Sequence, residues 1–366
     1  MKLRKSAVFG SILFIFSSFF LMSCSNFFLF TSKAKSNKDI SDKDIISDEV
    51  EGGRSRKDPF LQKKRPFSEL SDDFFVYLLE NEPETIGSLS VGYPNSGSLV
   101  NGVQMPEDPR WDVVNSQESW GTTETAKFII TVADKISKKF PDADKIHIGD
   151  ISYKDGGRLG RHVSHQAGRD VDLGWYYKNG SNQWWTKASK SNLDLEKSWT
   201  FIRSVITDTD VEMILIDKGV QEILYNYALN IGENKAWLDD IFQYPKRNNR
   251  AIIRHAKGHR THMHVRFYNP IAQEAGRRAY TYLVDNKLIQ PTRSYAHHKV
   301  KKGQTLGYLA KDYRTSVSAI KQANSLKSNV IRAGKLYRIP QKSGIKMVQE
   351  PISIPERRLP SLVLAD

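Results

Sequence analysis

Two short segments of the chain, 170–175 and 261–267, alternate polar and apolar residues, which indicates strands with one face in contact with water. Residues 122–140 instead carry apolar side chains at helical spacing, and Pro141 ends this pattern. Similar patterns predict two more strands, at 146–151 and 211–216, and two more helices, at 195–206 and 220–229. Because helices and strands mix without strict alternation, we predict an α+β fold in which helices pack on a small antiparallel sheet.

A smaller module is predicted near the carboxyl end, at residues 296–342. Thr305 and Ser316 can each cap a short amphipathic helix there, and a strand is predicted on either side of the helix pair. This βααβ order, opened by His298–Leu306 and closed by Leu336–Pro340, resembles the lysin motif (LysM). The resemblance implies binding to glycans that contain N-acetylglucosamine. The alternative is a helical hairpin that packs on the rest of the chain.

The first residues combine a basic start with an almost wholly apolar or small stretch, Ala7–Met22, and the sequence Leu-Met-Ser-Cys ends at Cys24. This is typical of a secretory signal peptide, residues 1–24, with a lipobox like that of bacterial lipoproteins. We therefore expect an exported, periplasmic protein that a lipid on Cys24 anchors to a bacterial membrane, with the outer membrane favoured. An uncut membrane helix over Ala7–Phe30 is the alternative.

Two further segments have compositions that do not support a core. Residues 25–68 are rich in Ser, Lys, Asp and Gly, so we predict a disordered tether. The tail, 343–366, is predicted to be flexible and contains Pro351, Pro355 and Pro360. Residues 69–290 lie between the tether and the LysM-like module, and this length is sufficient for one substantial domain.

Positive charge is concentrated in the LysM-like module. Residues 298–341 contain seven Lys and three Arg against one Asp, a net charge of +9 in a chain of formal net charge +14. A basic surface ordinarily suggests nucleic acid as a partner. An exported lipoprotein meets little nucleic acid, so we do not expect nucleic acid to be a partner of this protein. Acidic wall polymers and anionic head groups are the expected counterparts, and a merely solvated basic face is the alternative.

Histidine and aspartate residues on the two alternating segments suggest a metal site. If the two strands are neighbours and their solvent-facing sides are aligned, they would bring His165, Asp172 and His264 around one point. His262 would lie beside this point. Two imidazoles and one carboxylate leave one position open, as in catalytic zinc sites, whereas structural zinc usually fills four positions with Cys and His. Cys24 is the chain's single cysteine and lies in the leader, so it cannot complete a closed site.

Hydrolysis at such a site needs a base close to the attacking water. No Glu occurs between Ala251 and Pro270, so the usual carboxylate base of zinc peptidases is missing from this part of the sequence. His262 is a candidate base, because imidazole titrates near neutral pH.

Three segments resemble the penicillin-insensitive murein endopeptidases: Trp120-Gly121-Thr122, Gly160–Asp172 and His259–Arg266. That family belongs to a wider group with lysostaphin-type peptidases, D-alanyl-D-alanine carboxypeptidases and the hedgehog signalling domain. The resemblance covers roughly residues 85–285. The segment 179–186, which includes Trp184 and Trp185, has no counterpart that we can place.

The resemblance implies Zn²⁺ ligands at His165, Asp172 and His264, with His262 in the catalytic role. It also implies active-site positions at His162 and His259. The implied reaction is hydrolysis of the D-alanyl to meso-diaminopimelyl cross-link of peptidoglycan, by water and without a covalent intermediate. Since no serine nucleophile takes part, β-lactams would have nothing to acylate.

Two other functions remain compatible with the sequence. A D,D-carboxypeptidase of the same zinc group would use the same ligands, and the groove walls that distinguish its substrate cannot be identified from the sequence. A non-catalytic lipoprotein that binds peptidoglycan would need the metal only for structure.

Overall fold

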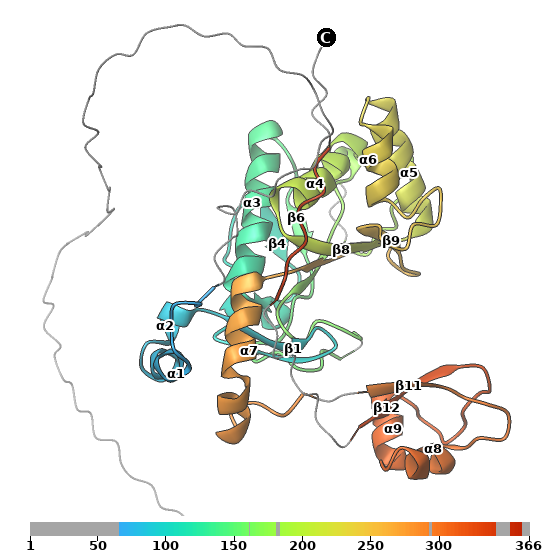
Figure 1. Cartoon of the computed structure of the whole chain (residues 1–366). Helices are drawn as coiled ribbons and strands as arrows, with labels where there is room; N and C mark the ends of the chain where they lie inside the picture. The colour runs from blue at the N-terminus through green and yellow to red at the C-terminus, as the bar shows by residue number, and fades with distance from the viewer. Residues whose placement is uncertain (1–65, 161, 181–183, 293–294, 342–351, 361–366) are drawn as a thin grey trace, which may run out of the picture. The chain divides into compact units, whose positions relative to one another are not determined.

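The computed structural model describes residues 66–160, 162–180, 184–292, 295–341 and 352–360 (Figure 1). The predicted signal peptide with Cys24, residues 25–65 of the predicted tether, and residues 343–351 and 361–366 of the predicted tail lie outside these ranges. Within the described ranges, no helix combines the length and the apolar character that a membrane span requires.

A six-stranded mixed sheet forms the centre of the larger domain. Its strands are, in spatial order, β4 (Trp111–Val113), β6 (Ile146–Ile148), β7 (Asp170–Leu173), β10 (Met263–Phe267), β8 (Val211–Ile216) and β9 (Ile253–His255). The inner strands pair antiparallel, as predicted, whereas the outer pairs β4–β6 and β8–β9 are parallel. The predicted neighbours, 170–175 and 261–267, are adjacent as β7 and β10.

Four helices contribute apolar side chains to the same core as this sheet: α3 (Thr123–Lys139), α4 (Leu195–Asp208), α5 (Lys218–Asn230) and α6 (Lys235–Ile241). Each begins where a side-chain oxygen accepts a hydrogen bond from a backbone N–H of the first turn, which satisfies a donor that the helix leaves unpaired. The capping residues are Thr122, Asp194, Asp217 and Asn234. The first three helices match the sequence prediction, and α6 was not predicted. The α+β fold class is therefore confirmed (Figure 1).

A second apolar cluster joins the two ends of this domain. It involves α1 (Asp72–Asn81), α2 (Pro83–Ile86), the hairpin β1 (Leu89–Tyr93) and β2 (Ser96–Val100), and α7 (Pro270–Asp285). Phe67 packs edge-on against Phe75 with ring centroids 5.5 Å apart, so ordered chain begins before Ser68, where the predicted tether ends. The short strands β3 (Val103–Gln104) and β5 (Trp120–Gly121) pair antiparallel.

The carboxyl-terminal module has the predicted βααβ order: β11 (Tyr295–Lys299), α8 (Leu306–Asp312), α9 (Val317–Ala323) and β12 (Leu336–Pro340). Its two strands pair antiparallel around a separate apolar core. Thr305 and Ser316 cap the two helices, each accepting a hydrogen bond of 3.1 Å from a backbone N–H three residues on. Both predicted caps are therefore present.

Part of the predicted tail contacts the larger domain. We call residues 352–360 the C-terminal segment. Its Arg357 pairs with Asp210 at 2.8 Å, and the carbonyl of Arg358 accepts a hydrogen bond of 2.7 Å from the indole N–H of Trp237. The sequence did not predict these contacts.

Candidate metal centre and active site

Strand pairing places an acidic residue opposite a residue with a basic side chain at two successive positions on one face of the sheet. In the register of β7 and β10, Asp172 lies opposite His264, and Asp170 lies opposite Arg266. Residues opposite each other on antiparallel strands have their side chains within contact distance. The pairing therefore brings together two residues ninety-two positions apart in the chain.

Three side-chain atoms converge beside this pair. His165 Nε2 lies 3.0 Å from His264 Nδ1, His264 Nδ1 lies 3.1 Å from Asp172 Oδ1, and His165 Nε2 lies 3.3 Å from the same oxygen. All three residues are buried. The structure thus brings together the three residues that the sequence suggested as metal ligands.

The outer nitrogens of both imidazoles are bound to acceptors. His165 Nδ1 donates to the carbonyl of Ile151 at 3.0 Å, and His264 Nε2 donates to Asp170 Oδ1 at 3.2 Å. Each ring then has only its inner nitrogen free to offer a lone pair, and both of these nitrogens face the Asp172 carboxylate. Three electron-rich atoms so close together require a cation or a shared proton between them, so the donor set fits a metal ion.

Asp170 orients both histidines from outside the centre. Its carboxylate accepts hydrogen bonds from the backbone N–H of His165 at 3.0 Å and from Arg266 Nε at 2.6 Å, in addition to the bond from His264. Burial would raise the pKa of Asp170, but the charges of His264 and Arg266 hold it well below its usual value. Asp170 therefore stays an acceptor, in agreement with the sequence interpretation that it fixes a neighbour.

The backbone of His165 is strained. Its φ is +65°, in the left-handed region that non-glycine residues seldom adopt. Its side chain is fully buried and its N–H and Nδ1 are both bonded, so the surroundings hold it in place. Strain of this kind concentrates at functional sites.

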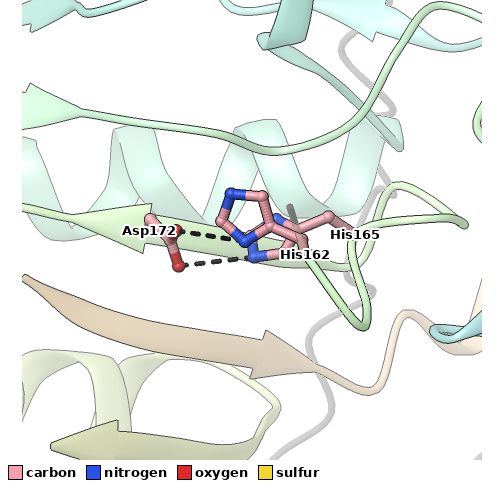
Figure 2. A group of neighbouring side chains, drawn as sticks. All are labelled: His162, His165 and Asp172. Carbon is pink, nitrogen blue, oxygen red and sulfur yellow. Dashed lines mark ion pairs between the residues drawn. The ribbon is translucent and has the colours of Figure 1, made fainter. Parts of the chain in front are cut away.

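His162 lies beside His165 and, like it, faces the Asp172 carboxylate (Figure 2). Its Nδ1 is 3.9 Å from Asp172 Oδ2, and its Nε2 lies 2.6 Å from Asp150 Oδ2. His162, His165 and Asp172 also meet the distance requirement for a metal-binding group, with ligand atoms within 4.8 Å of one another. We favour His264 over His162 as the third ligand, because its Nδ1 lies 3.1 Å from an Asp172 oxygen, whereas the distance from His162 Nδ1 to Asp172 Oδ2 is 3.9 Å.

His262 is next to the centre rather than in it. Its Nε2 lies 3.7 Å from Asp172 Oδ2, and its Nδ1 lies 2.9 Å from the hydroxyl of Thr261. Burial lowers the pKa of His262 to about 4. The ring is therefore neutral at neutral pH, and one of its nitrogens carries a lone pair.

His259 lies beside His262, with ring centroids 5.1 Å apart. Its carbonyl accepts a hydrogen bond of 2.8 Å from the N–H of Asp217, which fixes the loop before β10. Burial lowers the pKa of His259, and among the described residues its Nδ1 has no hydrogen-bond partner. All six sequence-predicted side chains with a role in binding or catalysis thus surround one point, while the predicted lipidation site, Cys24, lies outside the described residues.

Comparison with known families agrees with this geometry. Residues 90–284, more than half of the chain, match the family of penicillin-insensitive murein endopeptidases. The chain belongs to this family. Residues 298–340 match the LysM domain. A search of curated proteins found no match. The resemblance noted in the sequence is therefore confirmed, and the protein is a murein endopeptidase with a LysM domain.

Two residues at the centre of this murein endopeptidase were not predicted. Asp150 follows β6 and binds His162, and only its position at the end of a predicted strand hinted at a role. Trp184 lies against His262, with ring centroids 5.5 Å apart and planes at 21°. The feature of the sequence that could have indicated a role for Trp184 is a pair of tryptophans in an otherwise polar segment.

Proposed function

We propose that the protein is a zinc-dependent endopeptidase that hydrolyses the D-alanyl to meso-diaminopimelyl cross-links of peptidoglycan. The observation that carries the proposal is the convergence of two imidazole nitrogens and one carboxylate oxygen, with the outer nitrogen of each ring bound to an acceptor. Family membership supports the substrate class.

The donor set favours zinc. His165, Asp172 and His264 would hold it and leave one position open, which is the arrangement of catalytic zinc sites. When bound, zinc polarises the scissile carbonyl and lowers the pKa of the attacking water. The ligands are held by Ile151 and Asp170, so little of the centre would have to reorganise.

The remaining histidines supply the proton chemistry. His262 is neutral, lies on the Asp172 Oδ2 side of the centre, and can take a proton from the water and return it to the leaving amine. His162, held by Asp150, would hydrogen-bond the substrate or the oxyanion. His259 packs beside His262 and would limit the movement of its ring.

Digestion of purified sacculi by residues 25–366 tests the proposal. We expect chromatography to show loss of cross-linked muropeptide dimers, no loss after chelation, and recovery when Zn²⁺ is added back. His262→Asn should reduce turnover by about 10²-fold or more with metal content unchanged. His255→Asn, which changes an exposed histidine of β9, is the matched control. Persistence of dimers with metal-loaded protein would reject the proposal.

The same digestion separates the alternatives. A D,D-carboxypeptidase would release free D-alanine from monomeric pentapeptide and leave dimers intact. A non-catalytic protein would bind sacculi without producing either product.

We also propose that the protein is exported to the periplasm and anchored by a lipid on Cys24, while the LysM domain binds the glycan strands. The lipobox and the basic LysM segment support this location. Labelling of growing cells with a radioactive fatty acid tests the lipid anchor: we expect label on the wild-type protein and none on Cys24→Ser. A wild-type protein without label would contradict lipid anchoring.

A further inference from the structure

Trp184 covers one face of the His262 ring. The two rings are nearly parallel, at 21°, with centroids 5.5 Å apart. On the ring edge, the Thr261 hydroxyl lies 2.9 Å from Nδ1. The indole face restricts tilting of the imidazole and the hydroxyl restricts its rotation, so together they define the direction in which Nε2 points.

Gly149 makes room for this indole. A Cβ atom at position 149 would overlap Cζ2 and Cη2 of Trp184, so the ring can lie where it does only because residue 149 has no side chain. Gly149 follows β6 directly and precedes Asp150, the partner of His162. The six-membered ring of Trp184 therefore fills the space between the end of β6 and His262.

Two hydrogen bonds attach the chain that follows Trp184 to two other segments of the domain, at Tyr177 and at Arg260. The hydroxyl of Tyr177 donates to the carbonyl of Thr186 at 2.5 Å, and the N–H of Ala188 donates to the carbonyl of Arg260 at 2.9 Å. The second bond links this loop to the segment that holds His259 and His262. The indole and the imidazole are thus held to one another through the backbone as well as through ring contact.

We propose that Trp184 is a positioning residue that holds the His262 imidazole in its productive orientation. The inference rests on the proposed function, because it assigns the held ring to proton transfer. Misplacement of a catalytic group by about 1 Å can cost on the order of 10²-fold in rate, so a ring contact of this kind is large enough to matter. Trp184 acts through His262 and does not itself bind metal.

Steady-state kinetics on cross-linked muropeptide dimers test the proposal with three variants. Trp184→Ala should lower kcat by about 10- to 100-fold with a smaller effect on KM, since the catalytic ring and not the substrate loses its support. Trp184→Phe keeps an aromatic face and should recover most of the loss. Trp185→Ala, in which the neighbouring and exposed tryptophan is removed, should leave kcat unchanged. Equal losses in Trp184→Ala and Trp185→Ala would overturn the proposal.

Two double variants test whether Trp184 acts through His262. In a His262→Asn background, Trp184→Ala should have little further effect, because residues that act as a unit are not additive. Gly149→Ala should impair the wild type by displacing the indole and should cost much less in a Trp184→Ala background. If the losses of activity from the single substitutions are fully additive in both double variants, the proposal is contradicted.

A measurement without substrate separates this proposal from the proposed function. In ¹⁵N-histidine spectra of the metal-loaded protein, the ring signal that His262→Asn removes should shift or broaden in Trp184→Ala and be restored in Trp184→Phe. If the wild type cleaves no dimers but this signal responds as expected, the proposed function fails and the ring-holding role stands. If the His262 signal is unchanged in Trp184→Ala, Trp184 does not position His262, even if the enzyme is active.

Discussion

His264 is positioned so that a proton and a metal ion would compete for the same nitrogen. Burial alone would lower the pKa of His264, but the charge of Asp170 and hydrogen bonds to Asp170 and Asp172 outweigh it and raise the pKa to about 9. Without metal the ring is therefore charged at neutral pH, and its inner N–H lies between His165 and Asp172. The metal must displace this proton.

We therefore expect zinc binding at pH 7 to release about one proton from His264, and affinity to rise roughly tenfold per unit between pH 6 and pH 8. The sign follows from the raised pKa, because deprotonation becomes easier as the pH approaches 9. Calorimetric titration in buffers of different ionisation enthalpy measures the proton count. A heat that is independent of the buffer would contradict the expectation.

Asp170→Asn should weaken metal binding by about 10- to 100-fold, because the neutral amide no longer holds His264 and the backbone of His165 as the carboxylate does. It should also reduce the number of protons released, since Asp170 raises the pKa of His264. Competition with a chelator of known affinity measures the first effect. Asp142→Asn, which neutralises an exposed carboxylate, serves as control and should change neither.

At this scale the sequence was informative where residues share a strand or a short spacing. Asp172 and His264 could be grouped because two alternating segments each carry donors on one face, and His165 because it precedes Asp172 by seven positions. Asp150 and Trp184 could not, because their contacts with His162 and His262 depend on how a loop returns across the end of β6. The path of that loop cannot be predicted from the periodicity of apolar residues.

Among the elements, the start of α3 joins two parts of the domain. The Thr122 hydroxyl accepts a hydrogen bond of 3.1 Å from the N–H of Thr125 and also binds the amide of Asn269, just before α7. Thr122→Ala should lower the free energy of unfolding by about 1–2 kcal/mol, through loss of the cap and of this link. Chemical denaturation measures it.

Thr131→Ala is the matched control on the same helix. Thr131 is exposed, and within the described part of the chain its hydroxyl bonds only the carbonyl of Lys127 in the preceding turn, so its replacement should change stability by less than about 0.5 kcal/mol. Equal losses in the two variants would show that the cap contributes nothing.

Element prediction succeeded where one face of a segment is continuously apolar. Helix α3 and strand β8 have such faces and were predicted close to their observed bounds. The hairpin β1–β2 was not predicted: Ser and Gly interrupt its apolar residues, and part of its burial comes from α7, where Gly276 packs against the backbone of Ser90. The parallel outer pairs of the sheet likewise depend on crossovers that local periodicity does not encode.

In the whole molecule, the C-terminal segment stabilises the larger domain from outside. Deleting residues 352–366 removes the partner of Asp210 and the acceptor of the Trp237 indole, and should lower the free energy of unfolding by about 1–3 kcal/mol. Thermal melts measure this loss of stability. The fluorescence of Trp237 should shift to longer wavelength, because its indole loses the carbonyl of Arg358 and becomes exposed to water. Deleting 361–366 alone should have no such effect, and identical melts of the two truncations would contradict the expectation.

These contacts give the LysM domain two connections to the peptidase. The chain leaves α7 at Asp285, forms the LysM domain from Tyr295 to Pro340, and returns to the peptidase at residues 352–360. The second connection, 341–351, can span at most roughly 40 Å when fully extended. A protease that cuts between residues 286 and 294 would therefore not release the glycan-binding domain while the C-terminal segment remains bound. Tension from a glycan strand would be divided between two attachment points instead of pulling on α7 alone.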